Sequence, residues 1–355
     1  MDRQETQLSR RILAMKIAIT CIALVAAFLI GAALIALAGV NPWMALRYLV
    51  TGSLGSMHSI GDTLTRFVPL LMSTLAFAVG HQVGFMNIGA EGQLAMGSLG
   101  AVIVGVYVAA LPAFLHVPLA LLASFLFGAV WLGIAGFLKI RFKASELLNT
   151  MMLNYIAVYI IDILVEGILK EPGSRIDQTQ RVLETARLPH ILSGTRLHLG
   201  FILVLVISWL LYFFLWKTPV GFQIRAVGSS ERSARFAGMN VRRMLIIGIL
   251  ISGGIAGIGG GMELLGNQQR LLAGFDLGYG FDGIGAAVMG QYHPLGMILS
   301  SLLFAMLRVG AGAMQRNVGV PYPLVYIMQG VVIVTVILSS YFIEKQTEKM
   351  TKGAQ

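Results

Sequence analysis

The amino-acid sequence predicts an all-α polytopic membrane protein with about ten transmembrane helices. Of its 355 residues, 57% are apolar and only 12% are Asp, Glu, Lys or Arg, whereas a soluble domain carries about 25% charged residues. So few charges cannot form a water-facing surface around a chain of this length, and the mean hydropathy of +0.80 agrees. The 42 glycines are typical of closely packed transmembrane helices. A soluble protein is therefore excluded.

Apolar runs give the positions of the expected spans. The first run extends from Ile17 to about Val40 and is longer than the roughly 7–15-residue core of a signal peptide, so we expect a retained helix. A span needs about 20 residues, and further spans are expected near residues 60–80, 94–115, 117–138, 147–167, 199–216, 244–262, 281–291, 295–311 and 323–342. The 281–291 run is short and bounded by glycines, which also fits a half-helix or re-entrant segment. Residues 1–355 are expected to form one membrane domain.

Basic residues indicate the orientation of these spans. With ten crossings, four segments lie in the cytoplasm: the N-terminal stretch 1–16, the 139–143 turn, the 217–243 loop and the tail 343–355. These segments hold 16 of the 26 Lys and Arg residues, as the positive-inside rule requires. The net charge of +10 is then a feature of membrane topology, and no nucleic-acid partner is expected. The one long external loop, 168–198, resembles no enzyme domain.

The most unusual polar stretch runs from Gly84 to Gln93. It places Asn87, Glu91 and Gln93 beside three glycines, between two apolar runs. A carboxylate at membrane depth costs about 2.5–3.5 kcal/mol on insertion scales, so such residues face a cavity or a partner. The glycines allow a broken helix or a tight turn. Two interpretations stay open: this element lines or gates a translocation path, or its side chains hydrogen-bond neighbouring helices and hold the bundle together.

A second polar row lies on the fifth span. Residues four apart share a helix face, and such a series, interrupted only by Val158, contains Glu146, Thr150, Asn154, Asp162 and Glu166. Asn149 and Tyr155 flank it. In an apolar protein this row should turn inward or toward an aqueous cavity, and we expect Asn154 and Tyr155 to face that cavity. The alternative is that the row holds helices together.

The remaining sequence patterns do not indicate a catalytic or cofactor site. Gly253, Gly257 and Gly261 are spaced by four and predict a ridge for close helix packing. The G-x-G-x-x-G match at 278–283 lies in a short membrane segment and not in a strand–turn–helix unit, so it does not predict a dinucleotide site. The single cysteine, Cys21, excludes an intrachain disulfide, and the six histidines form no close cluster. No metal or cofactor is expected.

The 217–243 loop contains the signals of a short helix. Ser229 or Ser230 can cap its N-terminus, Glu231 is favourable in its first turn, and Gly238 can end it. The 229–238 segment should therefore form about two helical turns at the cytoplasmic face. This helix would dock a soluble partner, unless the loop is an ordinary positive-inside loop.

Taken together, these segments resemble a known family. The 217–243 loop resembles the coupling loop of ABC-importer permeases of the simple-sugar, branched-chain amino-acid and nucleoside class. The run Asn87-Ile88-Gly89-Ala90-Glu91-Gly92-Gln93 is similar to the nucleoside (guanosine-type) branch. Further matches occur in order at Met152-Leu153-Asn154-Tyr155, at Gly278-Tyr279-Gly280-Phe281-Asp282-Gly283-Ile284, and at Gly319-Val320-Pro321 followed by Gln329-Gly330. The resemblance extends from about residue 60 to 340.

The resemblance implies a multi-pass subunit in the lipid of a bacterial plasma membrane, with both termini cytoplasmic. It also implies a second permease subunit, two ABC ATP-binding subunits, and a lipoprotein or periplasmic protein that delivers substrate. The residues expected to line the path are Phe85, Asn87, Glu91, Gln93, Asn154 and Tyr155, and those expected to couple to the ATPase are Arg225, Glu231, Arg232, Arg235 and Phe236.

The chain has no G-x-x-x-x-G-K-[ST] phosphate loop, so ATP should be hydrolysed on another chain. It also lacks H-E-x-x-H and G-x-S-x-G, which argues against a membrane enzyme. A secondary transporter that uses Glu91 as an ion-coupling residue remains an alternative function. A nucleoside is the substrate that the resemblance to the guanosine-type branch implies, and the aromatic and amide side chains on the expected path could bind one. A simple sugar is the alternative substrate, since it would use the same residue types.

Overall fold

The computed structural model describes residues 18–19, 22, 25–109, 111–275 and 277–352. These residues form helices, joined by loops that hold three isolated β-bridges. The chain divides into two compact units. Residues 60–305 form one, called here the central unit, and the residues up to 59 together with those from 306 onward form the other, called here the terminal unit.

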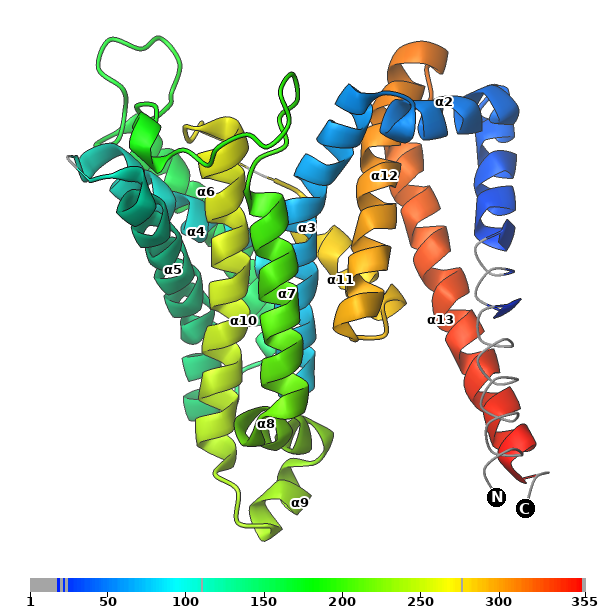
Figure 1. Cartoon of the computed structure of the whole chain (residues 1–355). Coiled ribbons are helices and arrows are strands. Elements are labelled where there is room, and N and C mark those ends of the chain that lie inside the picture. Colours follow the sequence, from blue (N-terminus) through cyan, green and yellow to red (C-terminus); the bar gives the residue numbers. More distant parts are fainter. Residues whose placement is uncertain (1–17, 20–21, 23–24, 110, 276, 353–355) are drawn as a thin grey trace. The chain divides into compact units, whose positions relative to one another are not determined.

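The central unit contains the helices that position the candidate site. In chain order they are α3 (Met57–Gln82), α4 (Ala90–Tyr107), α5 (Ala113–Phe142), α6 (Glu146–Glu166), the short η1 (Glu184–Ala186), α7 (Gly200–Lys217), α8 (Pro219–Ser229), α9 (Glu231–Phe236), α10 (Val241–Glu263), the π-helix η2 (Leu264–Gln268), α11 (Tyr279–Met289) and the start of α12 (Pro294–Val318). Helices α8 and α9 lie at one end of this unit, the α9 end (Figure 1). The 168–198 loop lies at the opposite end, the loop end (Figure 1).

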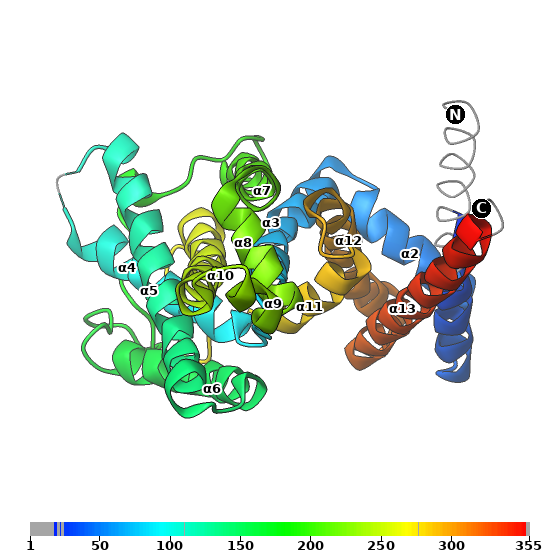
Figure 2. The ribbon, with the colours of Figure 1, turned by 90° about the horizontal axis from the view of Figure 1, so that it is seen from below.

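Glycines bring α4, α5 and α10 into backbone contact. A Cβ on Gly97 would overlap the backbone of Gly257, and one on Gly128 would overlap the backbone of Gly253. Seen from the α9 end, α10 runs beside α5 (Figure 2). The predicted ridge of glycines on α10 is thus confirmed as a packing surface, since only glycine permits such close approach.

The segment before α12 enters the unit as a broken helix. After η2 the described residues 269–275 and 277–278 are not helical, and the φ of Gly278, +66°, is left-handed. Helix α11 has only 11 residues, about 16 Å of helix, so it cannot cross a hydrocarbon core about 30 Å thick. The run expected at 281–291 is therefore a half-helix.

In the terminal unit, a helix over Val25–Leu37 is followed by α2 (Pro42–Leu54) at an angle of 120°. Asn41 caps α2 by accepting hydrogen bonds from the backbone N–H groups of Trp43 and Met44. The unit also contains the end of α12 and the long α13 (Tyr322–Lys352). The basic N-terminal stretch 1–16 and Cys21 lie outside the described residues.

The expected ten transmembrane helices are not confirmed. Within the described ranges, six helices are long and apolar enough to cross a membrane, or seven if the bent pair in the terminal unit counts as one span. Helix α4 starts with the polar Glu91 and Gln93, and α11 is a half-helix. In α13 the described residues include a shorter apolar stretch, Tyr326–Ser339.

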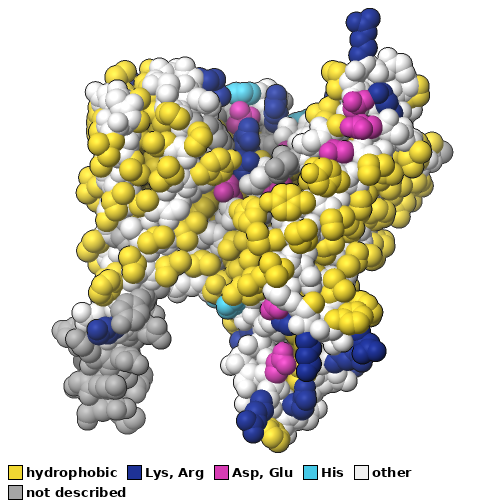
Figure 3. Space-filling model, turned by 180° about the vertical axis from the view of Figure 1, so that it is seen from behind, with side chains coloured by type: hydrophobic (Ala, Val, Ile, Leu, Met, Phe, Trp, Pro, Cys, Tyr) yellow, Lys and Arg dark blue, Asp and Glu magenta, His cyan; other side chains and the backbone are white. Residues whose placement is uncertain are grey.

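The surface of the central unit agrees with a membrane protein. Apolar side chains cover a broad region along its helices, and Lys and Arg side chains gather at the α9 end (Figure 3). Large apolar residues such as Phe137 on α5, Ile163 on α6 and Trp209 on α7 are exposed. Exposed apolar faces on several helices are expected where lipid or another membrane subunit covers them.

Candidate functional site

A buried carboxylate binds the N-terminus of the half-helix α11. Glu91 Oε1 accepts the backbone N–H groups of Leu277 and Gly278 at 2.9 and 2.8 Å, and Oε2 accepts that of Gly280 at 2.6 Å. Hydrogen bonds to a charged group contribute about 1.5–3 kcal/mol each, and the helix dipole adds to them. Three such bonds offset the cost of about 3 kcal/mol for placing a carboxylate in the membrane.

Close contact of the two backbones makes this geometry possible. Gly278 provides the left-handed turn that starts α11. A Cβ on Gly280 would lie 2.7 Å from the backbone N of Glu91 and 2.8 Å from its Cβ. Glycine is therefore required where α11 meets the first turn of α4.

A pair of amides holds the break between α3 and α4. The side chains of Asn87 and Gln93 donate to each other's oxygens, at 2.9 and 2.7 Å. Asn87 also donates to Ser252 on α10 at 2.9 Å, and Ser252 donates to the carbonyl of Ala76 on α3 at 2.6 Å. The break after α3 expected from the glycines is confirmed, and its polar side chains connect three helices.

Asn154 connects α6 to the same break. Its Oδ1 accepts the backbone N–H of Gly92 at 2.8 Å, and its Nδ2 donates to the carbonyl of Ile88 at 3.1 Å. Thr150 is also buried on this face, and Asp162 accepts the backbone N–H of Gly274 at 2.7 Å. Much of the predicted polar row thus turns inward, as expected.

The structure does not bring all six predicted path residues together. Asn87, Glu91, Gln93 and Asn154 form the buried polar cluster around the start of α4. Phe85 is fully buried next to it, with the Lys139 ammonium 5.2 Å from its ring centroid. Tyr155 lies apart from them, with 62% of its surface exposed.

The loop end is hydrogen-bonded to the chain that leads into α11. The backbone N–H of Thr179 donates to Leu271 O at 2.9 Å, that of Val182 to Gln269 O at 2.9 Å, and that of Ala273 to Asp177 O at 2.9 Å. In the same loop, burial lowers the pKa of the His198 imidazole to about 4, and the charge of His190 lowers it by a smaller amount. The 168–198 loop therefore holds residues 269–273, which lead toward α11.

Aromatic rings hold the turn between α11 and α12. Tyr292 stacks on His81 of α3, with ring centroids 3.8 Å apart. His293 makes edge contacts with Tyr212 and Trp216 of α7, at 5.8 and 5.6 Å. These contacts were not predicted from the sequence, although two aromatic residues directly after a short apolar segment are a usable signal of an anchored turn.

At the α9 end the predicted short helix is confirmed. Ser230 caps α9 by accepting the backbone N–H of Ser233, and the left-handed Gly238 (φ +80°) follows the helix. The preceding helix α8, with Thr218 as its cap and Pro219 in its first turn, was not predicted. A threonine cap followed by a proline in the first turn is a common signal for the start of a helix.

The five predicted coupling residues divide into two groups. Glu231, Arg232, Arg235 and Phe236 line one cavity of about 370 Å³ on α9. Phe236 is 83% exposed, and the Arg232 guanidinium lies 5.9 Å from its ring centroid. Arg225 instead packs inward: its guanidinium lies 5.4 Å from the Trp216 ring centroid, and its Nε donates to Leu215 O at 3.1 Å.

Comparison with known proteins identifies relatives along almost the whole chain. The family model described as "Branched-chain amino acid transport system / permease component" matches residues 59–337. The guanosine ABC transporter permease protein NupP of Bacillus subtilis is 35% identical over 337 residues, which cover 93% of this chain and 95% of NupP. The glucose ABC transporter permease protein TsgB13 of Haloferax volcanii is 33% identical, with 88% and 84% covered. A second Bacillus subtilis protein, the guanosine ABC transporter permease protein NupQ, is 26% identical, with 68% and 78% covered.

We predict that Glu91→Gln loosens α11 without unfolding the chain. A glutamine has one acceptor oxygen, so its amide would point donors at the N–H of Gly280 and leave groups unpaired, at about 1–3 kcal/mol. Hydrogen exchange of the purified protein should become faster over residues 277–283. Glu166→Gln is the matched control, because that carboxylate is exposed at the end of α6. Equal exchange in both variants would show that Glu91 does not hold α11.

Proposed function

This chain belongs to the family of permease components of branched-chain amino acid transport systems, and on that basis we propose that it is the permease of an ATP-driven nucleoside importer. A permease subunit forms the membrane passage and is not itself an enzyme. ATP is hydrolysed by two separate ATP-binding subunits, and a second permease completes the passage. The occurrence of two similar guanosine permeases, NupP and NupQ, in one organism supports a pair of different permeases.

A nucleoside is the proposed substrate. The support is the 35% identity to a guanosine permease along nearly the whole of both chains. A simple sugar is the second candidate, because the glucose permease TsgB13 is almost as similar. Both substrates are uncharged and rich in hydrogen-bonding groups, so a path lined by amide and tyrosine side chains suits either.

Two exposed tyrosines support a path along α6. Tyr155 and Tyr159 are one turn apart on the same face, and both are more than 60% exposed. Tyr155 lies near the middle of the 21-residue helix, where lipid offers its hydroxyl no partner. Tyrosines that face lipid belong at the membrane interfaces. We therefore propose that this face of α6 lines the path and that the second permease covers its other side.

The buried polar cluster next to this face is proposed to gate the path. Asn154 precedes Tyr155 and is bound to the break before α4, and Glu91 in α4 holds α11. A shift of α11 or of the break would therefore move α6 and its exposed tyrosines. Because these amides already have partners, they act as links between helices, and the delivering protein provides most of the substrate recognition.

Coupling to ATP hydrolysis is proposed to occur at α9. Phe236 is a large aromatic residue exposed among basic side chains at the basic end of the unit. Buried aromatic anchors flanked by arginine are typical centres of protein interfaces. The α9 end would then face the cytoplasm and the ATP-binding subunits. The loop end would face outward, where a lipoprotein or periplasmic protein delivers substrate.

A chain of contacts leads from this surface to the half-helix α11. Arg225 on α8 packs on Trp216 of α7, and Trp216 contacts His293 in the turn after α11. Gly228 of α8 also packs against the backbone of Gln82 and Gly84, directly before the buried polar cluster. Movement of α8 and α9 would therefore displace both the turn after α11 and the break before α4.

The test of the proposed function is uptake into liposomes that contain the complete importer. With a second permease, the ATP-binding subunits and a binding protein present, the complex should take up labelled guanosine when ATP is supplied. Uptake should persist when an uncoupler collapses the proton gradient, and a tenfold excess of glucose should not compete. Sensitivity to the uncoupler would favour the secondary transporter, and competition by glucose would favour the sugar importer.

Phe236→Asp should separate ATP hydrolysis from uptake. Loss of a central aromatic anchor weakens an interface by about 2 kcal/mol or more, which is about 30-fold in affinity. Fewer ATP-binding subunits should copurify, while the thermal stability of the permease stays unchanged. Arg196→Asp, an exposed change at the loop end, should leave copurification intact. Normal uptake by Phe236→Asp would exclude the docking role.

Trp216→Leu should lower uptake several-fold although the ATP-binding subunits still copurify, because it removes the contacts to Arg225 and His293. Trp209→Leu is the matched control. Trp209 lies on the same helix, is exposed and stacks on Phe213 instead. If the two variants lower uptake equally, the contacts of Trp216 do not transmit movement.

A further inference from the structure

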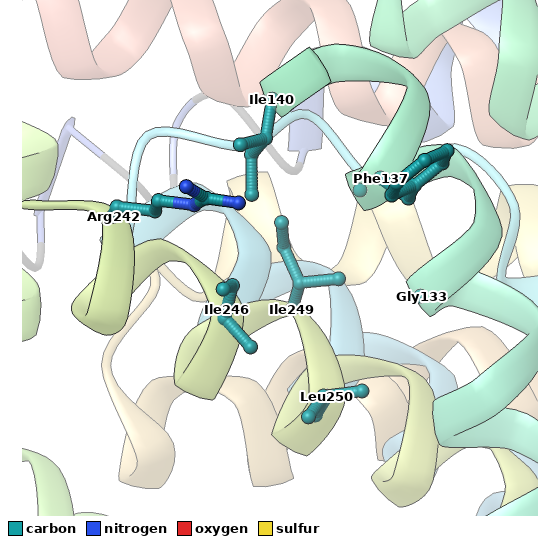
Figure 4. A pocket seen from close by; sticks show the side chains of 8 residues that line it. Gly133, Phe137, Ile140, Arg242, Ile246, Ile249 and Leu250 are labelled. Atoms are coloured by element: carbon teal, nitrogen blue, oxygen red, sulfur yellow. The ribbon is translucent and has the colours of Figure 1, made fainter.

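A surface groove runs between α5 and α10 near the α9 end (Figure 4). Its volume is about 210 Å³, and its lining consists of Gly133, Gly136, Phe137, Ile140, Arg242, Ile246, Ile249 and Leu250. The two helices touch through Gly128 and Gly253, and small Gly133 and Gly136 leave the space beyond that contact. Arg242 is the charged residue of this lining, and its guanidinium extends toward Ile140 at one end of the groove (Figure 4).

The groove opens into a basic cleft at the α9 end. This cleft, of about 430 Å³, shares Ile140 and Arg242 with the groove and is also lined by residues of the α5–α6 turn and of α9. Lys139 is paired there with Glu146 at 2.9 Å. Lys143, Arg235 and Arg242 are exposed and form no salt bridge among the described residues, and Glu231 is the remaining acidic residue of the lining. The cleft therefore carries excess positive charge.

The dimensions match one leaflet of a bilayer. From Arg242 to Leu250 the groove follows nine residues of α10, which rise by about 12 Å at 1.5 Å per residue. One leaflet contributes about 15 Å of hydrocarbon. Phe137 and Ile246 are exposed along this length. The apolar part is thus long enough for most of an acyl chain whose headgroup lies at the cationic end.

We propose that an anionic phospholipid binds in this groove, with an acyl chain between α5 and α10 and its phosphate at Arg242. A guanidinium forms bidentate hydrogen bonds with phosphate, and basic pockets between transmembrane helices on the cytoplasmic side bind anionic headgroups. Lys143 and Arg235 add attraction from the cleft. The charge favours lipid over a second permease, because a protein surface here would need its own carboxylate to avoid burying Arg242 unpaired. The proposal requires a membrane but not the proposed substrate.

Lipid titration of the purified complete importer in nanodiscs tests the site. The probe is fluorescent phosphatidylglycerol, with phosphatidylcholine as the neutral comparison, and native mass spectrometry counts the lipids retained. Arg242→Gln should weaken phosphatidylglycerol binding about fivefold, as expected for one cationic side chain near a headgroup. It should weaken phosphatidylcholine binding less, because the choline cation offsets the charge of the phosphate that both lipids share. Gly133→Leu should block the groove for both lipids. A Cβ there meets Leu250 at an ordinary 3.5 Å, so the helix pair should tolerate a larger residue.

Arg243→Gln is the matched control, because Arg243 is the exposed neighbour of Arg242 and lines neither the groove nor the cleft. The proposal fails if Arg242→Gln and Arg243→Gln bind phosphatidylglycerol equally, or if inorganic phosphate competes with the lipid. It also fails if Gly133→Leu releases the second permease without changing lipid binding, since the groove would then be a subunit interface. A variant that loses lipid binding but keeps guanosine uptake would show that the lipid site is independent of the proposed function. A variant that keeps lipid binding but loses uptake would show the same.

Discussion

The carboxylate of Glu91 on the N-terminus of α11 is the interaction on which the course of residues 264–293 depends. A half-helix that starts inside a membrane protein has N–H groups that neither lipid nor its own helix can satisfy. Glu91 satisfies three of them and places its negative charge at the positive end of the helix dipole. The Glu91 carboxylate and the N–H groups at the start of α11 are therefore hydrogen-bond partners of each other. Neither element would be stable at this depth without the other.

The chain before α11 and the turn after α11 are held by different kinds of interaction. Backbone hydrogen bonds to the 168–198 loop hold the former, and ring contacts of Tyr292 and His293 hold the latter. Hydrogen bonds to the backbone fix position and direction, whereas stacked rings can slide at small cost. The turn after α11 is accordingly the better suited of the two to respond to movement of α7 and α8, and the chain before α11 is the better suited to stay in place.

Much of this architecture follows from local sequence patterns. Apolar runs predicted the positions of the long helices from α3 to α7 and of α10, though not α2 or α8. Glycines predicted the break before α4 and the ridge on α10, and Ser229 or Ser230 was predicted to start α9, which Ser230 does. These features are local because caps, turns and periodicity act over a few residues. The partner of Glu91 could not be predicted, because it lies almost 190 residues further along the chain and the pairing depends on tertiary packing. The separation of Tyr155 from the buried Asn154 could not be predicted for a related reason: polar residues lie on two faces of α6, and sequence alone does not say which face packs inward.

The glycine contacts among α4, α5 and α10 restrict how this molecule can move. Where Gly97 meets Gly257 and Gly128 meets Gly253, main chain lies directly on main chain. Side chains in a packed core can change rotamer and let two helices adjust, but a backbone has no such freedom, so these helices cannot rotate or slide past one another without first separating. They behave as one solid block. Within the central unit, a cycle between two shapes would therefore leave this block unchanged and take place in the helices packed around it.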